Sequence, residues 1–109
     1  MVKSYEVVVT ARAENDHRNI LAYLAKNASY QTSEEIDSII INSIKKLHER
    51  PEINGLYKAN ILPTKGYRRV IIKRAWNLIF QIDEVKKIVF VLRILHVKRG
   101  DNFIKTAFK

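Results

Sequence analysis

The stretch from residue 67 to residue 99, YRRVIIKRAWNLIFQIDEVKKIVFVLRILHVKR, constrains the fold more than any other part of this chain. Val, Ile, Phe, Trp and Tyr dominate it, and such β-branched and aromatic residues favour strands. Charged residues interrupt it where turns are needed. The pattern predicts three consecutive antiparallel strands, at Tyr67–Lys73, Trp76–Asp83 and Lys87–Leu95.

These strands have an apolar face and a polar face, because every second side chain of a strand points to the same side. The apolar positions at this spacing are Trp76, Leu78, Phe80 and Ile82, and then Ile88, Phe90, Leu92 and Ile94. We expect the first half of the chain to cover this face. The opposite face is the place to look for function, and it carries Asn77, Gln81 and Arg93 beside Arg68, Arg69, Lys73 and Arg74.

The first half of the chain predicts one strand and two helices. Residues 3–9 form the strand, and Thr10 stands at the N-cap of a helix that runs to about Lys26. The spacing of Thr32 and Glu35 is that of a capping box, which predicts that a second helix begins there and ends before Pro51. The apolar stripe of the first helix consists of Ala13, Ile20, Leu21, Tyr23 and Leu24.

The predicted order is therefore βααβββ. It defines a single α+β domain over residues 1–109, with the N-terminal strand and a helical hairpin packed on an antiparallel sheet.

The positive charge of the chain is concentrated in its second half. Residues 1–52 hold seven Lys/Arg and eight Asp/Glu, a balance of −1, whereas residues 53–109 hold thirteen Lys/Arg and three Asp/Glu, a balance of +10. A clustered basic excess favours a polyanionic partner, such as a nucleic acid or an acidic protein segment. A basic surface that only maintains solubility is the alternative.

Several function classes lack the residues that they need. The chain has no cysteine, no histidine pair at the spacing of a metal motif and no glycine-rich phosphate loop. We expect no metal and no cofactor. With no apolar run of about 20 residues, we expect no membrane span. The chain has no cysteine and its start has a strand pattern in place of a signal peptide's apolar core, so we expect a cytoplasmic protein.

The remaining candidates for chemistry are basic residues of the sheet half: Arg68, Arg69, Arg93, His96, Lys98 and Arg99. Guanidinium groups can bind a scissile phosphate and stabilise its developing charge, and histidine can act as an acid or a base near neutral pH. The same set could instead form a docking patch. Alternatively, Arg93 is a half-buried arginine held by an acid, and His96 is a strand-end histidine without a special role.

At the level of motifs, the sequence resembles the RelE/ParE superfamily of bacterial type II toxins over nearly its whole length. The matching segments, in order, are Thr10-Ala-Arg-Ala with Asp16, Ile20 and Tyr23-Leu24, then Leu47-His-Glu-Arg-Pro51, Gly66-Tyr-Arg-Arg69, Leu78-Ile-Phe-Gln-Ile-Asp83 and Val91-Leu-Arg-Ile-Leu-His-Val-Lys-Arg99. The resemblance implies a toxin encoded beside an antitoxin that neutralises it. RelE-like members cleave mRNA on the ribosome, whereas ParE-like members poison DNA gyrase.

The chain departs from the RelE pattern at several of the positions that the resemblance makes functional. Arg68 keeps a basic residue on the first sheet strand, but Val70, Asn77 and Val97 stand where RelE-like toxins have basic residues. Phe103 stands where they have a catalytic tyrosine, and a phenyl ring cannot exchange a proton.

The run Arg93-Ile-Leu-His96, followed by Lys98-Arg99, resembles ParE-like toxins instead. The interpretation that we favour is a ParE-like plasmid-stabilisation toxin that binds and inhibits gyrase and is not an enzyme. The first alternative is a ribosome-dependent endoribonuclease that uses Arg68, Arg93, His96 and Arg99. The second alternative is an inactive relative that still binds the antitoxin.

The resemblance also implies a cognate antitoxin as partner. We expect an acidic, amphipathic antitoxin segment to lie over the helical hairpin and the sheet edge, and to bury apolar side chains of the C-terminal tail. The tail residues concerned are Phe103, Ile104 and Phe108. The resemblance allows a heterotetramer of toxin and antitoxin.

Overall fold

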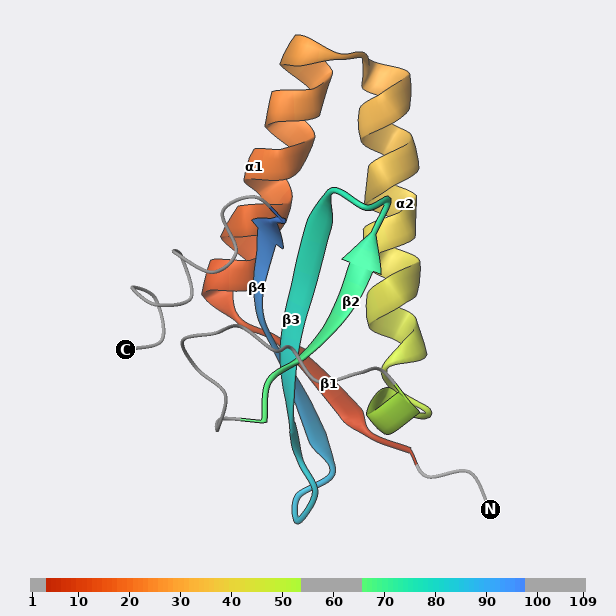
Figure 1. The fold of residues 1–109 in the computed structure, drawn as a ribbon, viewed down its shortest axis with the longest axis vertical. Helices are drawn as coiled ribbons and strands as arrows, with labels where there is room; N and C mark the ends of the chain where they lie inside the picture. Colours follow the sequence, from red (N-terminus) through yellow and green to blue (C-terminus); the bar gives the residue numbers. More distant parts are fainter. Residues whose placement is uncertain (1–3, 54–65, 98–109) are drawn as a thin grey trace.

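The computed structural model describes residues 4–53 and 66–97, which form two long helices, a short 3₁₀ helix and four strands (Figure 1). Their order confirms the predicted βααβββ arrangement and the α+β class. The elements are β1 (Glu6–Val9), α1 (Ala11–Asn27), α2 (Tyr30–Lys46), η1 (Pro51–Ile53), β2 (Arg68–Ile72), β3 (Trp76–Asp83) and β4 (Ile88–His96).

The four strands form one mixed sheet in the order β1-β4-β3-β2. The three C-terminal strands pair antiparallel, as the sequence predicts. The N-terminal strand β1 adds to the edge of β4 in the parallel direction, with Val9 beside Val91. Parallel neighbours need a long crossover connection, and the helical hairpin is part of that connection.

The start of α1 follows the prediction, whereas the start of α2 does not. The Thr10 hydroxyl accepts a hydrogen bond from the Ala13 amide at 3.2 Å and donates one to the Val91 carbonyl at 2.9 Å. The predicted capping box at Thr32 is wrong, because Ser29 is the N-cap and accepts from the Thr32 amide at 3.0 Å. A serine three residues earlier therefore begins the helix, and Thr32 lies inside its first turn.

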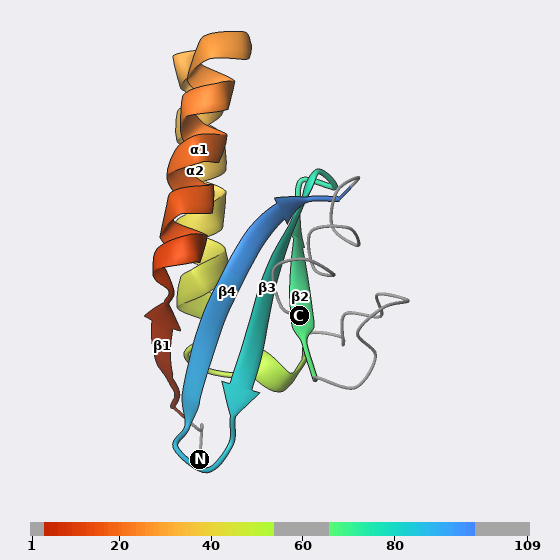
Figure 2. The same ribbon diagram turned by 90° about the vertical axis from the view of Figure 1, so that its left-hand side faces the viewer.

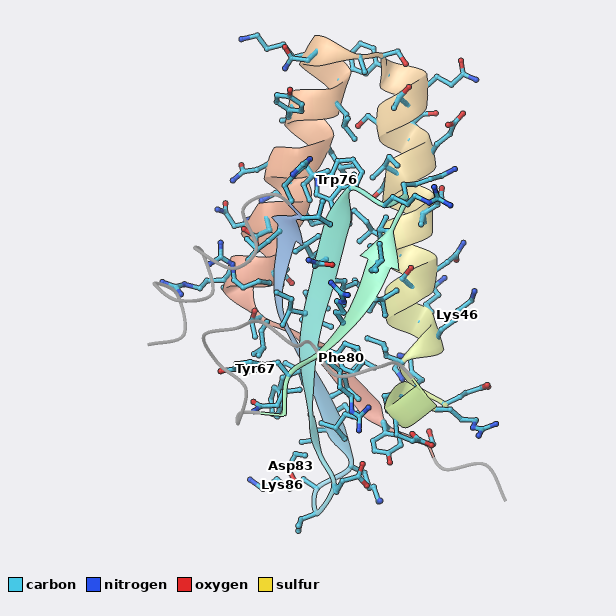
Figure 3. The ribbon with its side chains drawn as sticks, in the orientation of Figure 1. Lys46, Tyr67, Trp76, Phe80, Asp83 and Lys86 are labelled. Carbon is cyan, nitrogen blue, oxygen red and sulfur yellow. The ribbon has the colours of Figure 1, made fainter. Side chains whose placement is uncertain are left out.

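Both helices pack on one face of the sheet, and the core lies between the two layers (Figure 2). Phe80 is fully buried at the centre of β3, as expected (Figure 3). On β4 the predicted apolar face is wrong over its first half, because Val89 and Val91 point into this core in place of Ile88 and Phe90.

A β-bulge explains the error. Ile79 pairs with Arg93, but the next residue, Phe80, pairs with Val91, so Leu92 has no partner on β3. One extra residue on a strand reverses the alternation of side chains beyond it. Ile94 therefore faces the core as predicted, while the residues before the bulge are shifted by one position.

We call the sheet surface turned away from the helices the open face. It carries Asn77, Ile79 and Gln81 of β3, and their strand partners place Arg69, Arg93 and Leu95 on the same side. Ile79 and Asn77 are buried here, at 0% and 2% exposure. None of the helices within residues 4–53 and 66–97 has the length and apolar character that a membrane crossing requires.

Candidate functional site

Arg93, a predicted site residue, is bound by a carboxylate of α1. Its Nε donates to Oδ2 of Asp16 at 2.8 Å and its Nη2 donates to Oδ1 at 3.1 Å. The two side chains are only 13% and 12% exposed. This two-point contact is the strongest geometry for an arginine–carboxylate pair, and it matches the alternative in which an acid holds the arginine.

Asp16 also completes the edge of the sheet. The last pair between β1 and β4 joins Val9 to Val91, so the end of β4 extends beyond its parallel neighbour. There the Ile94 amide donates to Oδ2 of Asp16 at 2.9 Å. One carboxylate thus satisfies a backbone donor and a guanidinium, and it fixes α1 to β4. The sequence analysis named Asp16 only as part of the family motif, because nothing local indicates a contact across 77 positions.

The adjacent arginines Arg68 and Arg69 lie on opposite faces of the sheet, as neighbouring strand residues must. Arg68 pairs with Phe80 on the helix side, and its Nη1 donates to the Glu52 carbonyl at 3.2 Å. Arg69 lies on the open face, where its Nη1 donates to Oδ1 of Asn77 at 3.4 Å. The expectation that both arginines share one basic face is therefore wrong.

His96 stands at the exposed end of β4, opposite Trp76 at the start of β3. The two rings meet edge to face, with centroids 6.4 Å apart and planes at 85°. Lys98, Arg99, Phe103, Ile104 and Phe108 lie outside the described residues, so their assigned roles stay predictions.

Arg93 and His96 line a groove between α1 and the end of the sheet, which we call the α1–sheet groove. Both helices continue past Trp76 at the start of β3 (Figures 1 and 3). The groove beneath α1 has a volume of about 840 Å³. Its lining mixes aromatic, aliphatic, amide, acidic and basic groups: Asn15, Asp16, Asn19, Ile20, Tyr23, Ala75, Trp76, Arg93, Ile94, Leu95 and His96.

The sequence analysis missed this groove. It assigned Tyr23 to the buried stripe of α1, but the side chain is 64% exposed. The C-terminal part of α1 extends past the end of the sheet (Figure 2). In the described parts of the chain, no three His, Cys, Asp or Glu side chains gather in a way that could hold a metal ion. The groove offers a mixed apolar and polar binding surface, in which Asp16 already pairs with Arg93.

Comparison with known proteins identifies the family. The family model of the ParE toxin of type II toxin–antitoxin systems matches residues 7–100. The chain therefore belongs to the ParE toxin family, which confirms the resemblance to the RelE/ParE superfamily and to its ParE branch. A search of curated proteins found no match.

Solved structures share the fold at low sequence identity. A chain of the chromosomal ParDE toxin–antitoxin system from P. aeruginosa is 19% identical, with a TM-score of 0.70 over 87% of this chain and 98% of that one. A chain of the toxin–antitoxin complex RelBE2 from Mycobacterium tuberculosis is 18% identical, with a TM-score of 0.59 over 85% and 98%.

Proposed function

We propose that this protein is the toxin of a ParDE-type pair, which acts in the cytoplasm by binding DNA gyrase and is neutralised by its cognate antitoxin. Membership of the ParE family carries the proposal. The Arg93-Ile-Leu-His96 run, which resembles ParE-like toxins, ends in the α1–sheet groove.

The placement of the basic residues favours a binding inhibitor over a nuclease. Arg68 lies on β2, where its Nη1 donates to the Glu52 carbonyl, whereas Arg93 lies on β4 with β3 between them and its guanidinium faces α1, so the two guanidinium groups are not aimed at one phosphate. Arg93 also already binds the Asp16 carboxylate. A nuclease needs charged groups that converge on the scissile phosphate.

The α1–sheet groove is the docking surface that we propose for the antitoxin. Tyr23 and Trp76 provide aromatic contact area, and Asn15, Asn19 and His96 provide hydrogen-bonding groups beside it. An amphipathic segment fits such a lining, since its apolar side chains can bury the rings while its polar groups reach the amides and His96. Its acidic character is expected from the +10 balance of residues 53–109, because Arg93 is already paired with Asp16. The ParDE and RelBE2 neighbours come from toxin–antitoxin systems, which is consistent with a protein partner of this kind.

Pulse labelling after induced expression in a bacterial host tests the target. DNA synthesis and protein synthesis are followed separately, and purified toxin is added to a gyrase supercoiling assay. We expect DNA synthesis to fall first and supercoiling to be inhibited. If translation stops first and His96→Gln abolishes mRNA cleavage, the endoribonuclease alternative replaces this proposal. Growth without arrest would indicate the inactive relative.

A further inference from the structure

The turn between β2 and β3 has an unusual backbone for its residues. Lys73 and Arg74 have φ values of 51° and 59°, and the Ala75 amide donates to the Ile72 carbonyl at 3.0 Å. Two central residues with positive φ are characteristic of a type I′ turn, for which Asn-Gly is the preferred sequence. A Cβ atom disfavours this conformation, so Lys-Arg is a costly choice here.

A similar strain occurs at Lys87 in the β3–β4 turn, but there the side chain has compensating contacts. Lys87 has φ 56°, its Nζ lies 3.2 Å from Glu84, and it sits 5.3 Å from the centre of the Tyr5 ring. Lys73 and Arg74 are exposed, and within residues 4–53 and 66–97 the structure records no hydrogen bond or ion pair for either side chain. Side-chain contacts within these residues therefore do not explain why Lys73 and Arg74 occupy this turn.

The two ends of the sheet also differ in charge. At the β3–β4 turn, where Figure 3 labels Asp83 and Lys86, two acids balance two lysines. From Gly66 to Ile82 the sequence has four Lys/Arg and no acid. The Lys73–Arg74 turn thus places two adjacent cations at the end of the sheet with no carboxylate in either flanking strand up to Ile82.

We propose that the Lys73–Arg74 turn is a binding site for the phosphodiester backbone of a nucleic acid. A row of phosphates offers an anion to each of two neighbouring cations without requiring a particular sequence, and backbone contacts of this kind dominate non-specific affinity. The turn fixes the two Cα positions, so the strained conformation presents both cations together. This proposal does not depend on the proposed action on gyrase.

The test measures binding of the full-length toxin to two fluorescein-labelled probes of equal length, a DNA duplex and a single-stranded RNA, by anisotropy over a range of salt concentrations. Lys73→Gln/Arg74→Gln removes both charges. The matched control is Lys45→Gln/Lys46→Gln, an exposed adjacent pair in the last turn of α2 (Lys46 in Figure 3). It removes the same net charge from the other layer of the molecule.

Each lost phosphate contact lowers the slope of log K against log salt by about 0.9 on duplex DNA and about 0.7 on single strands. We expect the turn variant to lose about 1.8 or about 1.4 from its slope and roughly tenfold or more in affinity at low salt. The helix control should keep the wild-type slope. The probe with the larger loss identifies DNA or RNA as the ligand, and equal losses indicate recognition of the shared backbone.

A third variant separates charge from backbone strain. Lys73→Asn/Arg74→Gly removes both charges and relaxes the turn, so it should bind as weakly as the glutamine variant while melting at a higher temperature. An unchanged slope in the turn variants, or an equal loss in the helix control, would refute the proposal. Wild-type binding to an oligoglutamate peptide but to neither nucleic acid would refute it in favour of an acidic protein. Inhibition of gyrase is measured in a separate supercoiling assay, so the proposed function and the nucleic-acid site can each be refuted without the other.

Discussion

Asp16 and Arg93 are joined by two hydrogen bonds across 77 positions of sequence, at 2.8 and 3.1 Å. The pair sits where β4 extends past β1, so it holds the first helix to a strand end that lacks a parallel neighbour. A residue that the motif singles out for function therefore also has a structural task. Substitutions at Arg93 need a stability measurement before any loss of toxicity is assigned to the target.

Asp16→Asn should lower the free energy of unfolding by about 2–4 kcal/mol, because it leaves a largely buried guanidinium without its counter-charge. Urea unfolding measures the change. The control is Asp37→Asn, which removes the partner of His17 at 2.8 Å between the two helices. That pair is more exposed, so its loss should cost less than about 1 kcal/mol. Equal losses in the two variants would contradict the role assigned to Asp16.

The bulge at Leu92 predicts different costs for two phenylalanines. Phe80→Ala should cost about 3–5 kcal/mol of unfolding free energy, since the side chain is fully buried between sheet and helices. Phe90→Ala should cost clearly less, because Phe90 is half-buried and Val91 takes the core position. Chemical denaturation of both variants measures the two free energies. A larger loss for Phe90→Ala than for Phe80→Ala would contradict the bulge and support regular alternation along β4.

These examples show which features the sequence could predict. The strand order and the Thr10 cap depend on residues close together in the chain, so local patterns were sufficient. The side chains of β4 that face the core could not be predicted in the same way. The run Ile88–Leu92 is apolar at every position, so the odd-numbered and the even-numbered residues are equally suited to the core. Only pairing with β3 reveals the extra residue.

The candidate site was less predictable than the fold, because it depends on tertiary placement. The sequence singled out Arg93 and His96, and both line the α1–sheet groove. It could not show that Asp16 binds Arg93, that α1 extends past the end of the sheet, or that Tyr23 is exposed. Arg68 and Arg69 could have been separated in advance, since alternation along a strand places neighbours on opposite faces.

The strained β2–β3 turn predicts a gain in stability from substitution. Arg74→Gly should raise the free energy of unfolding by about 1 kcal/mol, because glycine adopts positive φ without a steric penalty. Thermal unfolding followed by circular dichroism measures the shift. Lys86→Gly is the control, because Lys86 lies in the other hairpin turn without a positive φ, and glycine there should be neutral or destabilising. A destabilised Arg74→Gly variant would show that the arginine side chain contributes a contact.

Tyr5 and Lys87 both donate hydrogen bonds to the Glu84 carboxylate, and we call these three residues the Glu84 cluster. The free energy of unfolding should decrease above pH 10, where Tyr5 and Lys87 lose their protons. Burial and then the hydrogen bond to Glu84 raise the pKa of Tyr5 above its ordinary value of 10.0. The hydrogen bond to Glu84 likewise raises the pKa of Lys87 above 10.5. The folded state then holds these protons more tightly than the unfolded state, so their contribution is complete below pH 10 and is lost as pH rises through the folded pKa values.

Tyr5→Phe should therefore flatten the decline in unfolding free energy above pH 10, measured by urea titration at each pH. Burial also raises the pKa of Tyr67, so part of the decline should remain in this variant. Tyr67→Phe removes that second contribution. A decline with wild-type steepness in Tyr5→Phe would show that the Glu84 cluster does not control it.

Tyr23 and Tyr30 provide a matched test of antitoxin docking. Both are exposed, at 64% and 79%, but Tyr23 lines the α1–sheet groove and Tyr30 does not line it. Tyr23→Glu should repel an acidic antitoxin segment and remove aromatic contact area, so affinity should fall by roughly tenfold or more. Tyr30→Glu should bind as wild type. Isothermal titration with the antitoxin encoded beside the toxin measures both affinities, and co-expression shows whether growth is still rescued. Full rescue and unchanged affinity in Tyr23→Glu would place the antitoxin on another surface.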